Sequence, residues 1–123
     1  MDTTAVSHED AFIKAGTLTE ALPWIRRFQG SIFVIKLGGN AMVDDTLLNA
    51  FADDMVFLAT VGVKPVVVHG GGPQISRAFG DKGITSEVQG CYRVTSTEAI
   101  PVIRDVLREE IGADLQRRIN HHS

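Results

Sequence analysis

The chain has 123 residues, the size of a single domain, which is enough to bury a hydrophobic core. Its 44% hydrophobic and 22% charged residues are those of an ordinary globular protein, and its net charge of −3 argues against nucleic acid or an anionic membrane as the main partner. The single cysteine, Cys91, excludes an intrachain disulfide and suits a reducing cytosol. The acidic N-terminus is unlike a signal peptide, and no apolar run approaches the roughly 20 residues that cross a bilayer. We therefore expect a cytoplasmic protein without a membrane partner.

The first predicted element is a helix from about Glu9 to Phe28. It carries an apolar stripe at helical spacing, formed by Leu18, Leu22, Ile25 and Phe28. Pro23 lies inside it and should kink or break the helix, because proline lacks the backbone N–H of a helix interior. A helix before the first strand has no evident place in a small core. We expect it to pack outside the domain or against another subunit.

Two apolar runs follow, Ser31–Leu37 and Pro65–His69, and both are rich in β-branched residues. Continuous apolar runs of this length predict strands buried on both faces, as in a parallel sheet. Between them lies a predicted helix with Asp44 or Asp45 as its N-cap and Gly62 at its end. Strand, helix and strand form a βαβ unit with a right-handed crossover.

A third helix is predicted to begin at Pro73 and to stop at Gly83. The segment Thr85–Val94, with Gly90 at its centre, reads as a short hairpin. The order of elements therefore indicates an α/β fold.

The last helix is predicted to open with a capping box formed by Thr95 and Glu98 and to run towards Asn120. Pro101 inside it is unfavourable, because a proline in the interior of a straight helix would lower its stability by about 3 kcal/mol. Exposed ion pairs are expected on its polar face, between Asp114 and the two arginines Arg117 and Arg118.

Both predicted strands end in glycines: Gly38 and Gly39 after the first, and Gly70, Gly71 and Gly72 after the second. In an open parallel sheet, ligands bind beyond the carboxyl ends of the strands. Glycine allows close approach of the backbone, so amides from both turns, with the start of the third helix, could form an anion site. The alternative is two tight turns of the kind that any α/β protein has.

Lys36 strengthens the ligand hypothesis. It lies within the first predicted strand, where a charge is costly without a partner, and its ammonium could reach over the glycine turns towards a phosphate. The alternative is a lysine at a strand end whose ammonium extends to water.

Other motifs are weaker. The sequence contains neither the P-loop pattern nor the dinucleotide fingerprint after the first strand. His69 is interpreted as a structural hydrogen-bond donor, His121 and His122 as a solvated tail, and Cys91 as a small apolar residue. No metal site is predicted.

Three motifs, KLGGNAM (36–42), PVVVHGGGPQI (65–75) and GCYRVT (90–95), together resemble acetylglutamate kinase of the amino-acid kinase superfamily. The resemblance implies a three-layer αβα sandwich with a mainly parallel sheet, of which only the N-terminal half is present. It implies that Lys36 contacts the transferring phosphoryl group and that Gly38, Gly39 and Gly70 line the phosphate site. It further implies that Gly71 and Gly72 hold acetylglutamate through their amides and that Arg93 binds one of its carboxylates.

The activity implied by this resemblance is phosphorylation of the γ-carboxylate of N-acetyl-L-glutamate by ATP with Mg²⁺, in arginine biosynthesis. Residues 1–29 are similar to the N-terminal kinked helix of arginine-sensitive members, which joins dimers into a hexamer (a trimer of dimers), and residues 30–123 would be a truncated acetylglutamate-binding part. Because the family's nucleotide pocket and second phosphate-binding lysine follow this region, we expect the chain to be inactive alone. Two alternatives stay open: an interaction module that docks on intact kinase subunits, or another amino-acid kinase such as aspartate kinase.

Overall fold

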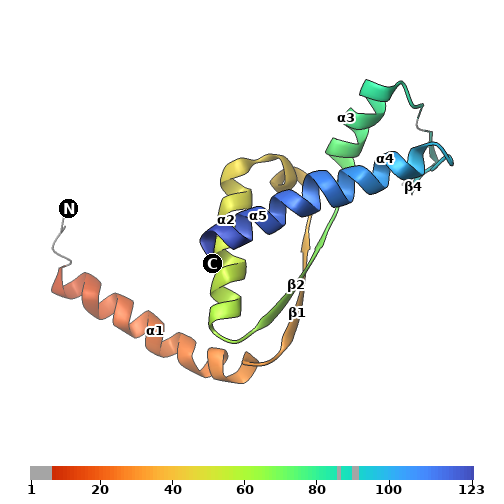
Figure 1. The fold of residues 1–123 in the computed structure, drawn as a ribbon. Helices are drawn as coiled ribbons and strands as arrows, with labels where there is room; N and C mark the ends of the chain where they lie inside the picture. Colours follow the sequence, from red (N-terminus) through yellow and green to blue (C-terminus); the bar gives the residue numbers. More distant parts are fainter. Residues whose placement is uncertain (1–6, 86, 90–91) are drawn as a thin grey trace.

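The computed structural model describes residues 7–85, 87–89 and 92–123 (Figure 1). The chain forms, in order, α1 (His8–Phe28), β1 (Ile32–Leu37), the 3₁₀ turn η1 (Gly39–Val43), α2 (Asp45–Thr60), β2 (Lys64–His69), α3 (Gly72–Lys82), β3 (Val88–Gln89), β4 (Tyr92–Arg93), α4 (Ala99–Asp105), the π-helical η2 (Val106–Gly112) and α5 (Ala113–His122). The last three elements follow one another without a break as a single helical rod (Figure 1). The α/β class and the parallel sheet are as predicted.

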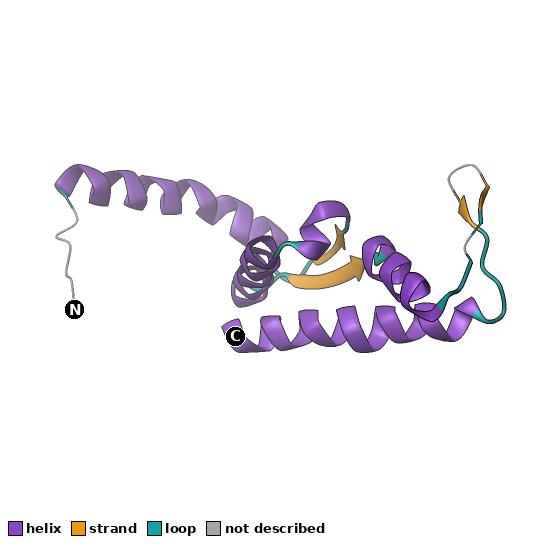
Figure 2. Cartoon of the chain, turned by 90° about the horizontal axis from the view of Figure 1, so that it is seen from above, coloured by secondary structure: helices purple, strands orange, loops and turns teal. Residues whose placement is uncertain are grey.

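Strands β1 and β2 are parallel neighbours, with Ile32 opposite Lys64 at one end and Leu37 opposite His69 at the other. Val67 of β2 packs against the buried core, so the helices cover the face of the sheet that carries it. Seen from above, the strands and the rod lie at two levels (Figure 2). The core between and beside them consists of Leu37, Met42, Leu48, Phe79, Ala99, Val102, Val106, Ile111 and Leu115.

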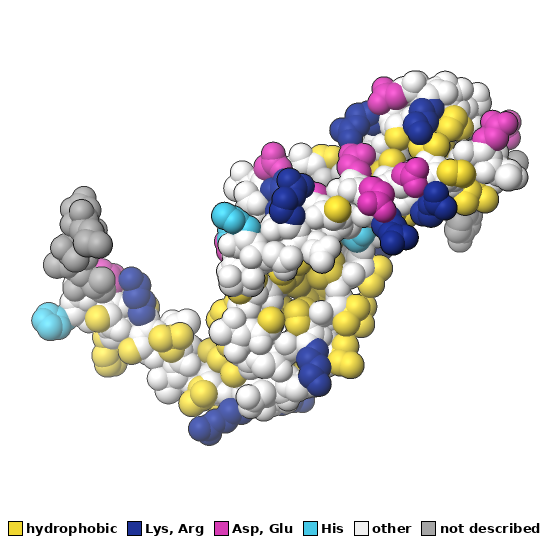
Figure 3. Space-filling view, in the orientation of Figure 1, with side chains coloured by type: hydrophobic (Ala, Val, Ile, Leu, Met, Phe, Trp, Pro, Cys, Tyr) yellow, Lys and Arg dark blue, Asp and Glu magenta, His cyan; other side chains and the backbone are white. Residues whose placement is uncertain are grey.

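The prediction that both strands are buried on both faces is wrong. Side chains alternate along each strand between half-buried and exposed, and Val34 and Val66 are 70% and 47% exposed. The same face carries Ile32, Val68 and Lys36. The reason is that no described element packs over this face. Hydrophobic side chains are accordingly visible on the surface in the region of the strands (Figure 3).

Helix α1 is one continuous helix through Pro23, so of the two expected effects, a kink or a break, the break is not present. The Ser7 hydroxyl accepts a hydrogen bond from the Asp10 amide and caps its start. The helix contains no buried residue and projects from the rest of the chain, as expected for an element outside the core (Figure 1). At its end, the rings of Phe28 and Phe33 meet edge to face at 5.3 Å.

Other helix boundaries are mostly as predicted. The Asp44 carboxylate accepts from the Leu47 amide at 3.0 Å and caps α2, whereas Gly83 adopts the left-handed conformation that ends α3. Strands β3 and β4 form the expected antiparallel hairpin. The central Gly90, like Cys91, lies outside the described residues.

The start of the last helix differs from the prediction. The Thr95–Glu98 capping box is absent: the Ala99 amide instead donates to the Ser96 hydroxyl at 3.3 Å. Pro101 falls in the first turn of α4, where an N–H has no intrahelical partner, so it costs the helix no hydrogen bond. The C-terminal histidines belong to α5, and His122 Nδ1 lies 2.6 Å from an Asp53 carboxylate oxygen of α2, which corrects the solvated-tail interpretation for His122.

Candidate functional site

The carboxyl ends of β1 and β2 meet at one edge of the sheet. Leu37 and His69 are register partners and the last residues of their strands, and the Gly70 amide donates to the Leu37 carbonyl at 3.1 Å. The turn that begins at Gly38 and the turn formed by Gly70–Gly72 therefore lie side by side. This confirms the arrangement on which the predicted anion site depends.

Lys36 lies at the same edge, opposite Val68 in the sheet. Its side chain is exposed on the uncovered face, so it is not the buried charge that the sequence predicted. The charge consequently needs no protein partner to offset a burial cost. An exposed ammonium one residue before the end of β1 is placed where a ligand bound over the glycine turns would be within reach.

The five glycines of the two turns differ in their surroundings. Gly39 has φ +64°, the left-handed region that favours glycine, and a Cβ atom on Gly38, Gly70 or Gly72 would meet nothing within 4 Å. Gly71 is buried, and a Cβ atom there would lie 2.8 Å from side-chain atoms of Leu107 and of Ile111. Gly71 is thus packed against the rod, where a larger residue would displace the ends of these two side chains, whereas the open glycines leave the backbone accessible.

The start of α3 contributes to the same edge. The helix begins at Gly72, directly after the second turn, with Pro73 in its first turn. The amides of a first helical turn have no intrahelical acceptor and carry the positive end of the helix dipole. The edge therefore combines amide donors with one ammonium group, a combination suited to a phosphate or carboxylate.

His69 has the structural role that the sequence suggested. Its Nδ1–H donates to the Gly70 carbonyl at 2.9 Å, which fixes the ring beside the second glycine turn.

Arg93 is not brought to this edge by the described backbone. It lies in β4, in the hairpin beside the start of α4, at a distance from the carboxyl ends of β1 and β2 in both views (Figures 1 and 2). Its side chain lies outside what the structure describes. The predicted contact with a substrate carboxylate stays a prediction.

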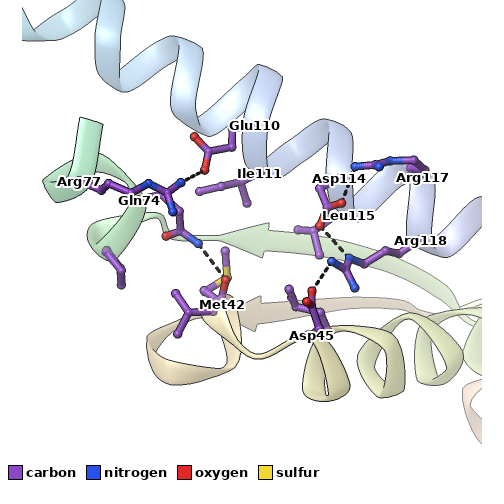
Figure 4. A pocket seen from close by; sticks show the side chains of 13 residues that line it. Met42, Asp45, Gln74, Arg77, Glu110, Ile111, Asp114, Leu115, Arg117 and Arg118 are labelled. Atoms are coloured by element: carbon purple, nitrogen blue, oxygen red, sulfur yellow. Dashed lines mark hydrogen bonds and ion pairs between the residues drawn. The ribbon is translucent and has the colours of Figure 1, made fainter. Parts of the chain in front are cut away.

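Two polar features beside the edge were missed by the sequence reading. The Gln74 side chain is buried and donates from Nε2 to the Met42 carbonyl at 2.8 Å. Both residues line the cavity shown in Figure 4. The cavity measures about 400 Å³ and lies between α2, α3 and the rod. A glutamine after a helix-starting proline gives no signal of burial in the sequence, because its partner is a backbone carbonyl from a different turn.

Arg118 is the second such feature. Its guanidinium binds Asp114 of its own helix at 2.7 Å and Asp45 at the start of α2 at 2.6 Å (Figure 4). The pKa of Arg118 is raised above its ordinary value, chiefly by the hydrogen bond to Asp114 and then by that to Asp45. The pairing of Asp114 with both arginines confirms the sequence prediction, but Asp45 was not foreseen.

Comparison with known proteins identifies the family. The sequence profile of the amino acid kinase family matches residues 31–122, from β1 to the end of the rod. The chain belongs to the amino acid kinase family. Within the part of the chain that the structure describes, no helix is long and apolar enough to span a membrane, and no group of three or more His, Cys, Asp or Glu side chains could hold a metal ion.

Relatives within the amino acid kinase family include acetylglutamate kinases. The chain is 57% identical over 121 residues to that of Arthrobacter sp. (strain FB24) and 54% identical over 110 residues to that of Corynebacterium glutamicum (strain R). These alignments cover 98% and 89% of this chain but 38% and 35% of the relatives. The chain thus spans little more than a third of their length.

A solved structure supports the fold. N-acetylglutamate synthase from Neisseria gonorrhoeae, complexed with coenzyme A and N-acetyl-glutamate, matches with a TM-score of 0.73 at 22% identity. The match covers 89% of this chain and 25% of that chain. At this identity the likeness concerns the fold alone.

Proposed function

We propose that these residues form the acetylglutamate- and phosphate-binding edge of an acetylglutamate kinase, which transfers the γ-phosphoryl group of ATP to the γ-carboxylate of N-acetyl-L-glutamate. The observation that carries the proposal is the meeting of Lys36 and both glycine turns at the carboxyl edge of one parallel sheet. The identity of 57% to an acetylglutamate kinase supports this substrate among those of the family. Arginine biosynthesis in the cytoplasm would be its setting.

The chemistry suits such an edge. A γ-carboxylate is already ionised at neutral pH, so its attack on the γ-phosphorus of ATP needs no general base. The difficulty is to bring two anions together, and catalysis then depends on positioning and on offsetting their charge. Lys36 would contact the transferring phosphoryl group. The amides of Gly38, Gly39 and Gly70 would receive phosphate oxygens, and those of Gly71 and Gly72 would hold acetylglutamate. The described residues include no group of three or more His, Cys, Asp or Glu side chains that could hold Mg²⁺.

The lysine can be tested against a matched control. Lys36 and Lys64 are both exposed on the same face of the same sheet, but they lie at opposite ends of it. We expect Lys36→Ala to weaken ATP binding by about tenfold or more, in line with the loss of a charge-assisted hydrogen bond of about 1.5–3 kcal/mol. Lys64→Ala should leave it unchanged. Isothermal titration calorimetry with ATP measures both, and equal losses in the two variants would refute a specific role for Lys36.

Turnover is a separate question. Among the described residues the edge offers one ammonium group to two reacting anions, so we propose that the 123 residues on their own bind ligands without completing phosphoryl transfer. A coupled assay of ADP release with acetylglutamate tests this. Turnover well above that of Lys36→Ala would show that the chain suffices.

Arg93 is proposed to bind a carboxylate of acetylglutamate, because a guanidinium binds carboxylates bidentately. Its position in the hairpin would require β3 and β4 to close towards the glycine edge. Arg93→Lys should therefore weaken acetylglutamate binding and leave ATP binding intact. A parallel titration with aspartate separates this activity from that of an aspartate kinase.

The exposed helix α1 favours a second role in association. None of its residues is buried, and its large exposed side chains are Phe12, Ile13, Leu18, Leu22 and Trp24. We propose that it joins subunits of a homo-oligomer, or docks this chain on intact kinase subunits. Leu22→Asp should then reduce the mass measured by light scattering, or abolish co-purification with the intact kinase, and Thr19→Asp on the same helix serves as the polar-site control.

A further inference from the structure

Gln74 occupies an unusual position for an amide side chain. It is 8% exposed, and its Nε2 donates to the carbonyl of Met42, 32 positions earlier in the chain, at 2.8 Å (Figure 4). The donor and acceptor assignment is fixed by the partner, because a carbonyl oxygen can only accept.

This hydrogen bond links the elements that follow the two glycine turns. Met42 belongs to η1, which begins at Gly39 in the turn after β1, and Gln74 lies in the first turn of α3, which begins at Gly72 after β2. The backbone joins the two turns at their base, through the Gly70 amide and the Leu37 carbonyl. Gln74 adds a second link, between η1 and the first turn of α3.

Four of the five glycines have open space where a side chain would lie. A Cβ atom on Gly38, Gly39, Gly70 or Gly72 would meet no atom within 4 Å, so these backbone segments are not wedged by neighbours. Gly71 alone of the five is packed against the rod.

We propose that Gln74 is a positioning residue that sets the separation of the two glycine turns, and with it the spacing of the amides that receive a polyphosphate. This inference rests on the proposed function of the edge. Donors that come from two separate turns act together only at a fixed spacing, and displacements of about 1 Å at such sites are costly in rate. Gln74 itself touches no ligand in this scheme.

The oxygen of the side-chain amide makes it possible to separate this role from stability. Gln74 Oε1 is buried without a hydrogen-bond partner among the described residues. A buried acceptor without a donor is unfavourable, so replacing the amide by an apolar chain of similar length removes one unfavourable group while it breaks the tie to Met42. Gln74→Met should therefore fold about as stably as the parent chain.

The test uses the full chain with inorganic tripolyphosphate as the probe and compares Gln74→Met with Gln116→Met. Gln116 is an exposed glutamine of α5, so the control makes the same chemical change away from the edge. Three quantities are measured: the thermal midpoint, the affinity for tripolyphosphate by calorimetry, and amide hydrogen exchange across residues 39–43 and 72–75 by NMR. We expect Gln74→Met to keep its midpoint, to lose about tenfold in affinity, the scale of one hydrogen bond, and to exchange faster in both segments. The control should change none of these.

Two results would overturn the inference. One is an unchanged affinity and unchanged exchange in Gln74→Met, and the other is a loss of affinity that only follows a lowered midpoint. Should Gln74→Met fold poorly, Gln74→Leu is the second variant, because it also cannot donate to Met42, and the same criteria apply. If the parent chain itself binds no tripolyphosphate, the proposed function of the edge fails, and the exchange data still decide whether Gln74 ties the turns.

Discussion

Gly71 packs against Ile111 so closely that a Cβ atom on Gly71 would lie 2.8 Å from Cδ1 of Ile111. This contact places the second glycine turn directly against the helical rod, at its π-helical segment. One glycine of the triplet therefore serves packing, whatever the turn binds. The distinction between packed and open glycines separates stability from ligand binding in mutational tests.

Gly71→Ala should destabilise the chain by about 1 kcal/mol, because the terminal methyl groups of Leu107 and Ile111 must shift to admit the added methyl group. Gly72→Ala is the matched control, since its Cβ atom would meet nothing within 4 Å. Urea unfolding followed by circular dichroism measures both. Equal midpoints for the two variants would contradict the packing role of Gly71.

The two prolines of the helical segments should respond differently to alanine. Pro23 lies inside α1, where proline costs about 3 kcal/mol, so Pro23→Ala should raise the helicity and the amide protection of α1. Pro101 lies in the first turn of α4, and Pro101→Ala should change the protection of that helix little. Hydrogen exchange by mass spectrometry resolves the two regions, and a large gain at Pro101 would count against the observed start of α4.

Arg118 links α5 to the start of α2, and its side chain is 20% exposed. Arg118→Lys should lower the free energy of unfolding by about 1 kcal/mol, because lysine cannot reproduce the planar fork that binds Asp114 and Asp45 together. Arg104→Lys, at a more exposed arginine that pairs with its neighbour Asp105, is the control. Similar losses in the free energy of unfolding of both variants, measured by chemical denaturation, would show that the link between α5 and α2 adds no more stability than an exposed ion pair.

The stabilisation that Arg118 gains from Asp114 and Asp45 has a defined pH dependence. The pKa of Arg118 is raised by hydrogen bonds from its guanidinium to Asp114 and Asp45, so folding favours the protonated form. The resulting stabilisation is fully present below the ordinary arginine pKa and is lost only as the pH rises through the still higher folded value. The stability difference between the parent and Arg118→Lys should therefore stay constant between about pH 7 and pH 9. A difference that shrinks across this range would contradict the assignment.

The uncovered face of the sheet gives a test with neighbouring residues. Val34 points to the exposed face and Ile35 to the half-buried one. Ile35→Thr should destabilise by about 2 kcal/mol through lost burial and a buried hydroxyl, whereas Val34→Thr should stay within about 0.5 kcal/mol. Val34→Thr should also reduce binding of the dye ANS, since it removes apolar surface. A larger stability loss at Val34 than at Ile35 would mean that the two faces are assigned the wrong way round.

Local signals in the sequence were sufficient for most elements. Asp44 is a residue type whose side chain accepts from the first turn of a helix, and Gly83 is one that adopts the left-handed conformation at a helix end, so both boundaries were predictable. The capping box failed because Ser96, one residue further on, accepts from the Ala99 amide, whereas Thr95 would have accepted from the Glu98 amide. Two adjacent hydroxyl residues give nearly the same signal in the sequence. The glycines after β1 and β2 were recognised as one edge because parallel strands in a βαβ unit must end on the same side.

The sequence by itself determined the elements, the direction of the two strands and the residues of their glycine turns, because these depend on periodicity, caps and chain direction. Only the tertiary structure decided that one face of the sheet is uncovered, that Lys36 is exposed, that Gly71 is packed, and that Gln74 ties η1 to α3. Each of these depends on which segment, many residues away, lies against the one in question. An apolar strand has the same composition whether one or both of its faces are covered. The sequence likewise does not distinguish a buried glutamine from an exposed one.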